Sequence, residues 1–214
     1  VLSIVTATIM FTGCDENINQ NDLIYIKGKS SFDSIQSAID HCEHGDIVVI
    51  NDGLFNERLV INKSISLKGS GKNSCIIDGN YSDDVLRIES EYVTISGITF
   101  QKGGNNRYTV MDSCIDIRSS NVSIINCEMK ESFYGVYLAM DTDNCQIKNC
   151  NIQNNSWGIS FQFSSRNTIE SNTISNNKEY GMYVGSNSNE NIISDNNIMN
   201  NQYAMRIKTS FDNE

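Results

Sequence analysis

The chain has 214 residues and a formal net charge of −10 at pH 7, with an isoelectric point near 4.6. This acidity argues against nucleic acid and against an anionic membrane surface as partners. The length suits one repeat domain with a large core, preceded by a short lead.

The first 14 residues are apolar and uncharged. Such a run is too short to cross a bilayer and is typical of the core of a secretory signal. Its end, Phe11-Thr12-Gly13-Cys14, resembles a lipoprotein signal box, whose cysteine becomes the lipidated first residue. We therefore expect an exported protein held by lipidated Cys14 on the extracytoplasmic side of a membrane, at the cell surface or in the periplasm. Residues 15–30 would be a polar tether, and an uncleaved anchor or plain secretion is the alternative.

A helix is predicted over residues 34–44, at the start of the domain that we assign to residues 31–210. Ile35, Ala38, Ile39 and Cys42 follow the spacing i, i+3, i+4 and i+7, which places them on one helical face. Gly45 is a stop signal after this segment. An amphipathic helix of this kind can cover the open end of a stack of strands.

The second half of the chain repeats with a period near 23 residues. Tyr134, Trp157, Tyr180 and Tyr203 are each 23 residues apart, and each precedes a small residue and an apolar-x-apolar step. A second series runs through Ile124, Ile147, Ile169 and Ile193, with steps of 23, 22 and 24 residues. A fixed period of this length marks a repeat architecture.

Each repeat contains short stretches of alternating apolar and polar residues, separated by Asn, Ser and Gly, and lacks a long helical stripe. The sequence therefore predicts an all-β fold, a single-stranded parallel β-helix with one coil per repeat. About seven coils fit between Asp46 and Lys208, which gives a rod about 34 Å long at about 4.8 Å per coil.

Several segments resemble the right-handed parallel β-helix proteins of the pectin lyase-like fold. The closest likeness is to the NosD-like group and to the related carbohydrate-binding and sugar-hydrolase repeat proteins. It covers about residues 30 to 208. The segments that carry it are Ser34-Ile35-Gln36-Ser37-Ala38-Ile39, Gly45-Asp46-Ile47-Val48-Val49, Gly53-Leu54-Phe55-Asn56-Glu57, Val60-Ile61-Asn62-Lys63-Ser64-Ile65, Ile76-Ile77-Asp78-Gly79 and the Tyr-Gly-Met-Tyr-Val repeat at 180–184. The resemblance implies a right-handed coil, and it implies polysaccharide as a class of ligand.

Strand alternation predicts an outward face on the strands that contain the aromatic series. On this face we expect Tyr137, Gln162, Tyr183 and Trp157 to bind a sugar chain, because sugar rings stack on aromatic side chains and amides bind hydroxyl groups. The alternatives are a solvated face and, for Tyr134, Trp157, Tyr180 and Tyr203, internal packing.

Charged residues on the same face are candidates for chemistry. Asp116, Arg118, Arg206 and Lys208 are the catalytic candidates of a polysaccharide lyase or hydrolase, and Arg206-Ile207-Lys208 matches a short polygalacturonase motif. The Gly-His-Gly motif of those enzymes is absent.

Four carboxylates are candidate Ca²⁺ ligands, because Ca²⁺ takes six to eight oxygen ligands. They are Asp112, Asp116, Asp141 and Asp143. Two solvated turns are the alternative.

Two other residue pairs have open interpretations. The NosD-like resemblance implies a role in copper-site maturation, for which His41 and His44 are the candidate ligands. Cys127 and Cys150 occupy the same repeat position, so we expect them to be stacked neighbours, either as small buried hydrophobes or as a disulfide.

Three functions therefore follow from the sequence. The first is a lipid-anchored β-helix protein that binds polysaccharide or a cell-surface glycan. The second is a polysaccharide lyase or hydrolase. The third is a NosD-like accessory protein for a metal site, or a structural protein of the cell envelope.

Overall fold

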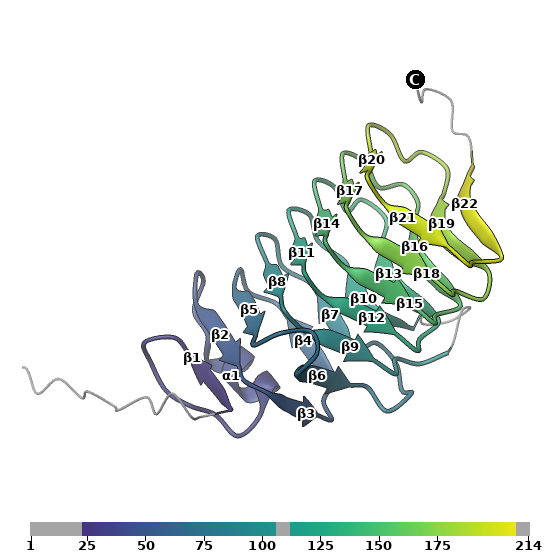
Figure 1. Ribbon diagram of the computed structural model, residues 1–214. Coiled ribbons are helices and arrows are strands. Elements are labelled where there is room, and N and C mark those ends of the chain that lie inside the picture. Colours follow the sequence, from purple (N-terminus) through teal and green to yellow (C-terminus); the bar gives the residue numbers. More distant parts are fainter. Residues whose placement is uncertain (1–22, 106–111, 209–214) are drawn as a thin grey trace, which may run out of the picture.

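The computed structural model describes residues 23–105 and 112–208, and it consists of seven stacked coils (Figure 1). Each coil contributes one strand to each of three sheets, here named A, B and C. Strands of adjacent coils pair in parallel throughout. The predicted all-β parallel β-helix of about seven coils with a period near 23 is confirmed.

The strands are short and recur in the order A, B, C. Sheet A contains β1 (Ile24–Ile26), β2 (Ile47–Ile50), β5 (Ser66–Gly69), β8 (Thr94–Ser96), β11 (Ser123–Ile125), β14 (Gln146–Lys148), β17 (Thr168–Glu170) and β20 (Ile192–Ser194). Sheet B contains β3 (Gly53–Phe55), β6 (Cys75–Asp78), β9 (Thr99–Gln101), β12 (Glu128–Lys130), β15 (Asn151–Gln153), β18 (Thr173–Ser175) and β21 (Asn197–Met199). Sheet C contains β4 (Leu59–Ile61), β7 (Leu86–Ile88), β10 (Ser113–Ile117), β13 (Tyr134–Leu138), β16 (Trp157–Phe161), β19 (Tyr180–Val184) and β22 (Tyr203–Ile207).

The core is a set of columns of apolar side chains inside the coil. Ile124, Ile147 and Ile169 stack in register in sheet A and are buried. Val136 and Ile159 stack in sheet C in the same way. The period-two alternation of the sequence therefore puts like residues above like, and each column removes apolar surface from water.

The corner between sheets A and B is a tight turn that contains a left-handed residue in each of the last five coils. Gly97, Asn126, Asn149, Ser171 and Asp195 occupy it with φ between 52° and 69°. Asn tolerates this conformation better than most residues because its side chain bonds to nearby backbone. The high Asn content of the repeats thus has a structural cause.

Stacked Asn side chains satisfy the backbone at the corners. In one ladder, Asn155 N donates to Asn177 Oδ1 at 3.0 Å, and Asn177 N donates to Asn201 Oδ1 at 2.9 Å. A second ladder connects Cys150, Asn172 and Asn196 with N···Oδ1 distances of 2.9 Å. These bonds provide partners for N–H groups that the turns remove from the strand ladders.

The first coil is covered by α1 (Ile35–His41), which is shorter than the predicted 34–44 because Cys42 already has extended backbone. Ile35, Ala38 and Ile39 are fully buried, as the helical spacing predicts. Ser34 caps the helix, and its hydroxyl accepts a hydrogen bond from Ser37 N.

The predicted tether at 15–30 is wrong for the part of it that the structure describes. Ile24–Ile26 form β1, which pairs antiparallel with β2. Ile24 and Ile26 are buried, because the alternation in this short stretch gives it an apolar face. The signal segment and Cys14 lie outside the described residues.

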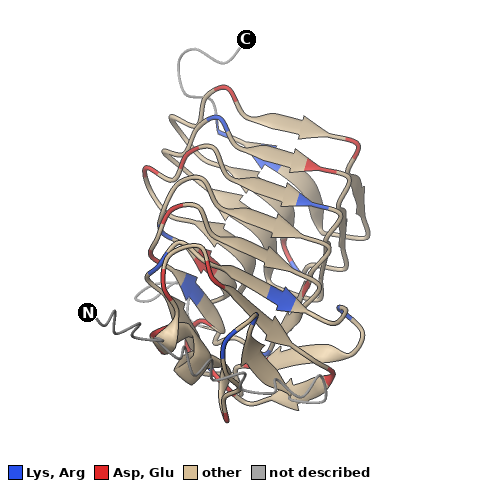
Figure 2. Cartoon of the chain, turned by 90° about the vertical axis from the view of Figure 1, so that its left-hand side faces the viewer, with Lys and Arg blue, Asp and Glu red and all other residues tan. Residues whose placement is uncertain are grey.

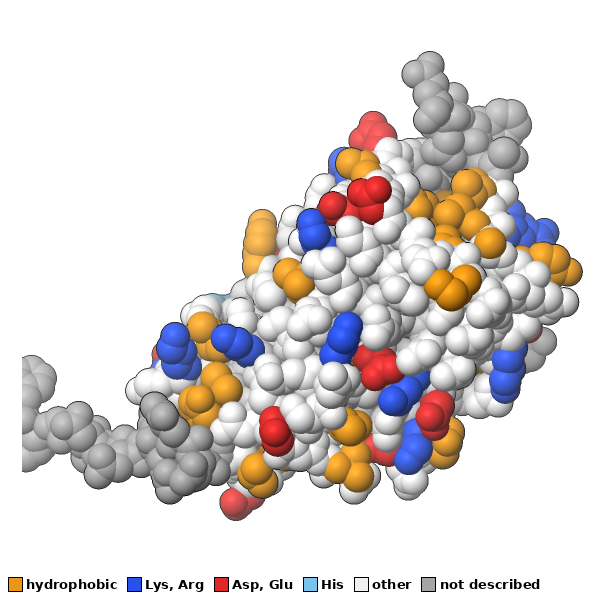
Figure 3. Space-filling model, in the orientation of Figure 1, with side chains coloured by type: hydrophobic (Ala, Val, Ile, Leu, Met, Phe, Trp, Pro, Cys, Tyr) orange, Lys and Arg blue, Asp and Glu red, His pale blue; other side chains and the backbone are white. Residues whose placement is uncertain are grey.

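Charged residues are mixed in sign and lie mostly at the turns between strands (Figure 2). Hydrophobic side chains gather at the surface near the β22 end (Figure 3), where Met199, Tyr203 and Ile207 are exposed. Within residues 23–105 and 112–208, no helix is long and apolar enough to cross a membrane.

Candidate functional site

The outer face of sheet C carries a continuous group of aromatic side chains, here called the aromatic strip. Its members are Phe133, Tyr134, Tyr137, Trp157, Tyr180, Tyr183 and Tyr203. Phe133, Tyr134 and Trp157 form a hydrophobic cluster separate from the main core. The strip therefore lies outside the coil, although most of its rings are covered by one another.

The β-helix period sets the order of the strip. Tyr134, Trp157, Tyr180 and Tyr203 occupy paired positions on consecutive strands. The ring centroids of Trp157 and Tyr180 are 4.7 Å apart with an edge-to-face geometry, and those of Tyr180 and Tyr203 are 5.2 Å apart and stacked. These are favourable aromatic geometries, so the strip is a preorganised surface.

Exposure rises along the strip towards the last coil. Trp157 is 6% exposed, whereas Tyr203 is 52% exposed. Tyr137 and Tyr183 are half-buried and point outward from their strands, with Ser160 between them in the same column. The small Ser160 leaves room for the Trp157 ring, which lies 4.9 Å from the ring of Tyr183.

A buried charge cluster lies next to Tyr137, at the two preceding strands of sheet C, β10 and β7. Asp116 pairs in register with Tyr137 on one side and with Arg87 on the other. Arg118 Nε donates to Asp116 Oδ2 at 2.6 Å, and Arg87 Nε lies 3.7 Å from the same oxygen. Arg87 also forms an ion pair with Asp84 at 3.0 Å.

Asp84 and Asp116 form a buried carboxyl pair. Burial and the charge of Asp116 raise the pKa of Asp84 to about 7, and burial also raises the pKa of Asp116. Asp116 Oδ1 is buried and has no hydrogen-bond partner among the described residues. A carboxyl group with a raised pKa can donate a proton to a leaving group or accept one from water.

Access to this carboxyl pair is restricted. Asp116 is 1% exposed and Asp84 is also buried, beneath the partly exposed guanidinium groups of Arg87 and Arg118. The arrangement is a charge-balanced cluster at the end of the aromatic strip. A substrate would have to displace Arg118 to reach the pair.

The predicted ligand-binding residues lie on or beside the strip. Tyr137, Trp157 and Tyr183 belong to it. Gln162 is half-buried just beyond β16, next to Gly185, where an added Cβ would lie 2.3 Å from the Gln162 Cβ.

Two predicted catalytic candidates are far from the carboxyl pair. Arg206 and Lys208 lie on the last coil, four strands beyond Asp116 in sheet C. Arg206 is exposed, and its Nη1 donates to the Tyr180 hydroxyl at 2.9 Å. Arg206 therefore contacts the aromatic strip, whereas Asp116 and Arg118 belong to the buried charge cluster.

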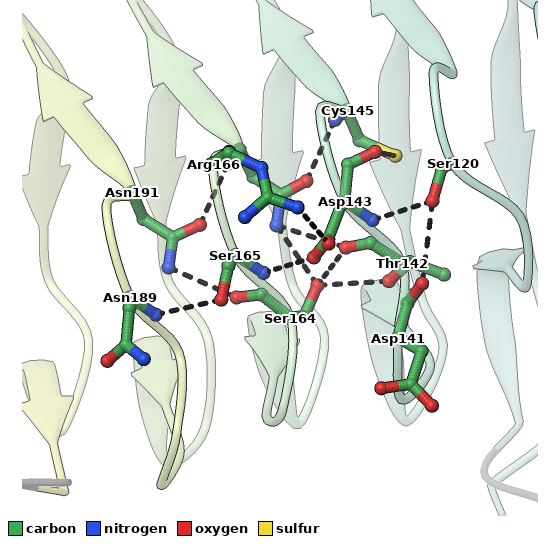
Figure 4. Close-up of polar contacts among 11 residues, drawn as sticks. Ser120, Asp141, Thr142, Asp143, Cys145, Ser164, Ser165, Arg166, Asn189 and Asn191 are labelled. Carbon is green, nitrogen blue, oxygen red and sulfur yellow. Dashed lines mark hydrogen bonds and ion pairs between the residues drawn. The ribbon is translucent and has the colours of Figure 1, made fainter.

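The four predicted Ca²⁺ ligands do not form one group. In the part of the chain that the structure describes, no three His, Cys, Asp or Glu side chains are placed to hold a metal ion. Asp143 forms an ion pair with Arg166 and accepts from Ser165 N at 2.7 Å. Figure 4 shows the Asp141 carboxylate pointing away from Asp143. Asp116 lies on β10 of sheet C and Asp112 directly precedes that strand, away from this turn.

The two histidines each make a local contact. His41 Nδ1 lies 2.7 Å from Ser37 O, and His44 Nδ1 accepts from Ser64 N at 3.2 Å. These contacts fix the rings to the cap and its neighbouring turn.

Cys127 and Cys150 are stacked neighbours with free thiols, and Cys127 N lies 3.5 Å from Cys150 Sγ. Burial raises the pKa of Cys127, so a neutral buried thiol is favoured at this position.

Sequence reasoning missed Asp84 and Arg87, because their coil departs from the repeat pattern. Extending the register of sheet C from β10 to the preceding strand, β7, would have identified Arg87, because Arg87 pairs with Asp116. Asp84 lies in the turn before β7, where neither the two-residue alternation of a strand nor the 23-residue repeat applies.

A family model described as right handed beta helix region matches residues 85–214. The chain belongs to the right handed beta helix region family. No curated protein matches this β-helix chain.

Solved structures share the same fold at low sequence identity. A pectin methylesterase in complex with a hexasaccharide has a TM-score of 0.57 at 12% identity, covering 78% of this β-helix chain and 64% of its own. A pectate lyase has a TM-score of 0.58 at 13% identity, covering 74% and 48%. The catalytic domain of an alpha-1,3-glucanase in complex with tetrasaccharides has a TM-score of 0.57 at 13% identity, covering 78% and 38%. The β-helix chain thus spans less than two thirds of each of these proteins, and the likeness shows the pectin lyase-like fold.

Proposed function

We propose that this protein binds an extended glycan along the outer face of sheet C, with the aromatic strip as its platform. The observation that carries the proposal is the strip itself, which lies outside the core and becomes exposed towards Tyr203. Sugar rings present apolar faces that stack on Tyr and Trp, and their hydroxyl groups bind polar side chains such as Gln162 and Arg206.

The spacing of the strip supports an extended ligand. Aromatic rings recur once per coil on four consecutive strands, and adjacent strands of a sheet are about 4.8 Å apart. A chain of sugars lying along the rod axis would therefore meet a new ring every one or two coils. The pectin methylesterase, the pectate lyase and the alpha-1,3-glucanase that share this fold support polysaccharide as the ligand class.

A second candidate function is catalysis on the same glycan. The specific observation that favours it is the buried pair of Asp84 and Asp116 at one end of the strip, where burial raises the pKa of both carboxyl groups. A hydrolase needs one carboxyl as acid and one as base or nucleophile. Arg87 would then hold the two carboxyl groups in position through its contacts with Asp84 and Asp116.

We also propose that the protein is exported and anchored through Cys14. The apolar segment at 1–14 and its signal-box resemblance support this, as does the extracellular occurrence of most polysaccharides. Metabolic labelling with a fatty-acid analogue tests it, because Cys14→Ser should then abolish incorporation. Incorporation that persists in this variant would exclude Cys14 as the attachment site.

The binding proposal is tested by affinity electrophoresis of the protein in gels containing a panel of neutral and acidic polysaccharides. We expect at least one polysaccharide to retard the protein. Tyr183→Ala should lower the affinity for that polysaccharide about tenfold, because the stacking energy of the ring is lost. Tyr92→Ala is the matched control, since Tyr92 is exposed but lies outside the strip. Equal retardation of the two variants would contradict the assignment of the strip.

The catalytic candidate is tested on the same panel by assaying released reducing ends and unsaturated products. Turnover by the wild type that Asp116→Asn abolishes, with retardation unchanged, would support catalysis by the carboxyl pair. Binding without any product would leave a recognition protein.

A further inference from the structure

A hollow of about 250 Å³ lies at the corner between sheets B and C, beside the aromatic strip. Its lining comes from five consecutive coils and includes Tyr81, Gly103, Ser132, Asn154, Ser156 and Lys178. Ser132 and Ser156 directly precede Phe133 and Trp157, so the hollow opens next to the strip.

Two glycines of one coil form part of the lining of the hollow. Gly103 follows Lys102, which corresponds in register to Glu131 and Asn154 of the next two coils, so Gly103 lies opposite Ser132. An added Cβ on Gly103 would lie 2.5 Å from Ser132 Oγ, and one on Gly104 would overlap the Asp112 carboxylate. The chain can therefore run this close to its neighbours only with glycine at these two positions.

Tyr81 forms one wall of the hollow by reaching across the glycine coil. Its hydroxyl donates to Oε2 of Glu131 at 3.1 Å, and Glu131 lies two coils further along the chain. Lys102 Nζ lies 5.9 Å from the centroid of the Tyr81 ring and is itself fixed by Asp78 at 2.7 Å. The ring is thus held in place, yet Tyr81 is 60% exposed.

The remaining walls are polar. Lys178 is exposed and forms no ion pair with another described residue. Asn154 is exposed beside it, and Ser156 adds a hydroxyl group. An aromatic face together with an ammonium, an amide and a hydroxyl group suits the mixed polarity of a sugar ring.

We propose that this hollow is a separate sugar-binding site that holds one pyranose unit, a side branch or an end residue of the glycan on the strip. The volume lies below the range of pockets for drug-sized ligands, which fits a single ring. Tyr81 stacks on the ring, and Lys178 and Asn154 bind its hydroxyl groups. The inference rests on the proposed glycan function, which it extends from linear to branched or terminal sugars.

Saturation-transfer NMR with a panel of methyl glycosides tests this site without a polysaccharide. We expect at least one glycoside to receive saturation from the wild-type protein. Tyr81→Ala and Lys178→Met should each weaken this binding about fivefold, by loss of stacking or of a charged donor. Tyr92→Ala is the control for an exposed tyrosine elsewhere, and Tyr183→Ala is the control for the strip.

The outcomes separate the two proposals. Saturation that is lost in the Tyr81 and Lys178 variants and kept in the Tyr183 variant supports the hollow. Saturation that is lost only in the Tyr183 variant places the monosaccharide on the strip and overturns the hollow. No transfer to any glycoside also overturns the hollow, whereas the strip proposal is decided separately by polysaccharide retardation.

Discussion

At the scale of single residues, the charge cluster on sheet C shows how neighbours change the chemistry of a carboxyl group. Asp116 was a candidate from the sequence because it falls on the outward face. The structure buries it beneath Arg118 and Arg87 and places it against Asp84. Its environment is therefore set by residues two positions away and by the neighbouring coil, which the repeat pattern does not specify.

The Asp84–Asp116 pair predicts a pH dependence of stability. The folded-state pKa of Asp84 is about 7, above the value of about 3.9 for an unfolded chain. Between these values the folded protein holds a proton that the unfolded chain has released, so this group's contribution to stability is present below about pH 4 and is lost as the pH rises through 7.

Thermal unfolding of the wild type and of Asp84→Asn between pH 4 and 8 checks this. The wild type should lose more stability than the variant as the pH rises across this window. Asp195→Asn, at an exposed turn, is the control. Parallel curves for wild type and Asp84→Asn would show that the pair titrates normally.

The Asn ladder gives a second prediction at this scale. Asn177→Ala leaves the buried N–H of Asn155 without its acceptor, and this should lower the free energy of unfolding by about 1–3 kcal/mol. Asn151→Ala, on the outer face of sheet B, should change it by less than about 0.5 kcal/mol. Urea denaturation measures both, and equal effects would contradict the role of the ladder.

At the scale of elements, the cap helix α1 shows a contact that no local sequence pattern indicates. Glu57, from the turn between β3 and β4, accepts hydrogen bonds from Ile35 N and Gln36 N, both at 3.0 Å. A carboxylate at this position satisfies free N–H groups of the first helical turn and favours the positive end of the helix dipole.

Glu57→Gln should therefore lower the free energy of unfolding by about 1 kcal/mol, because the amide has one oxygen and no charge. Urea denaturation measures the loss. Glu89→Gln, an exposed carboxylate after β7, is the control and should have little effect. A loss no larger than that of the control would mean that Ser34 caps the helix without help from Glu57.

The sequence predicts some helices and strands of this fold but not others. The strands of the later coils and the buried face of α1 follow from periodicity, since a period of two and a period of 3.6 each select one face. β1 was missed because three residues, Ile24–Ile26, are too few to establish an alternation. The aromatic strip was identified as a series, but whether it packs inside or outside depends on the geometry of the corner at Tyr134 and Trp157.

At the scale of the whole molecule, the seven coils form a one-dimensional stack with unequal ends. The first coil is covered by α1 and β1, whereas β20, β21 and β22 each pair on one side only within residues 23–105 and 112–208. In such a stack each coil is stabilised by its neighbours. The free energy of local opening should therefore be lowest in the last coil.

Hydrogen exchange followed by mass spectrometry tests this expectation. Amides of β22 should exchange faster than those of β13 and β16, which pair on both sides. Equal protection would indicate that the last coil is covered in solution.

The central claim is that the aromatic strip binds glycan, and the chain offers a direct reporter for it. Trp157 is the single tryptophan of the sequence and lies within the strip. Its fluorescence should change in a saturable way when the polysaccharide that retards the protein is added, and Tyr183→Ala should weaken the response about tenfold while Tyr92→Ala leaves it intact. Retardation by a polysaccharide with no change in Trp157 fluorescence, and with equal affinity in both variants, would place the glycan elsewhere and contradict the account.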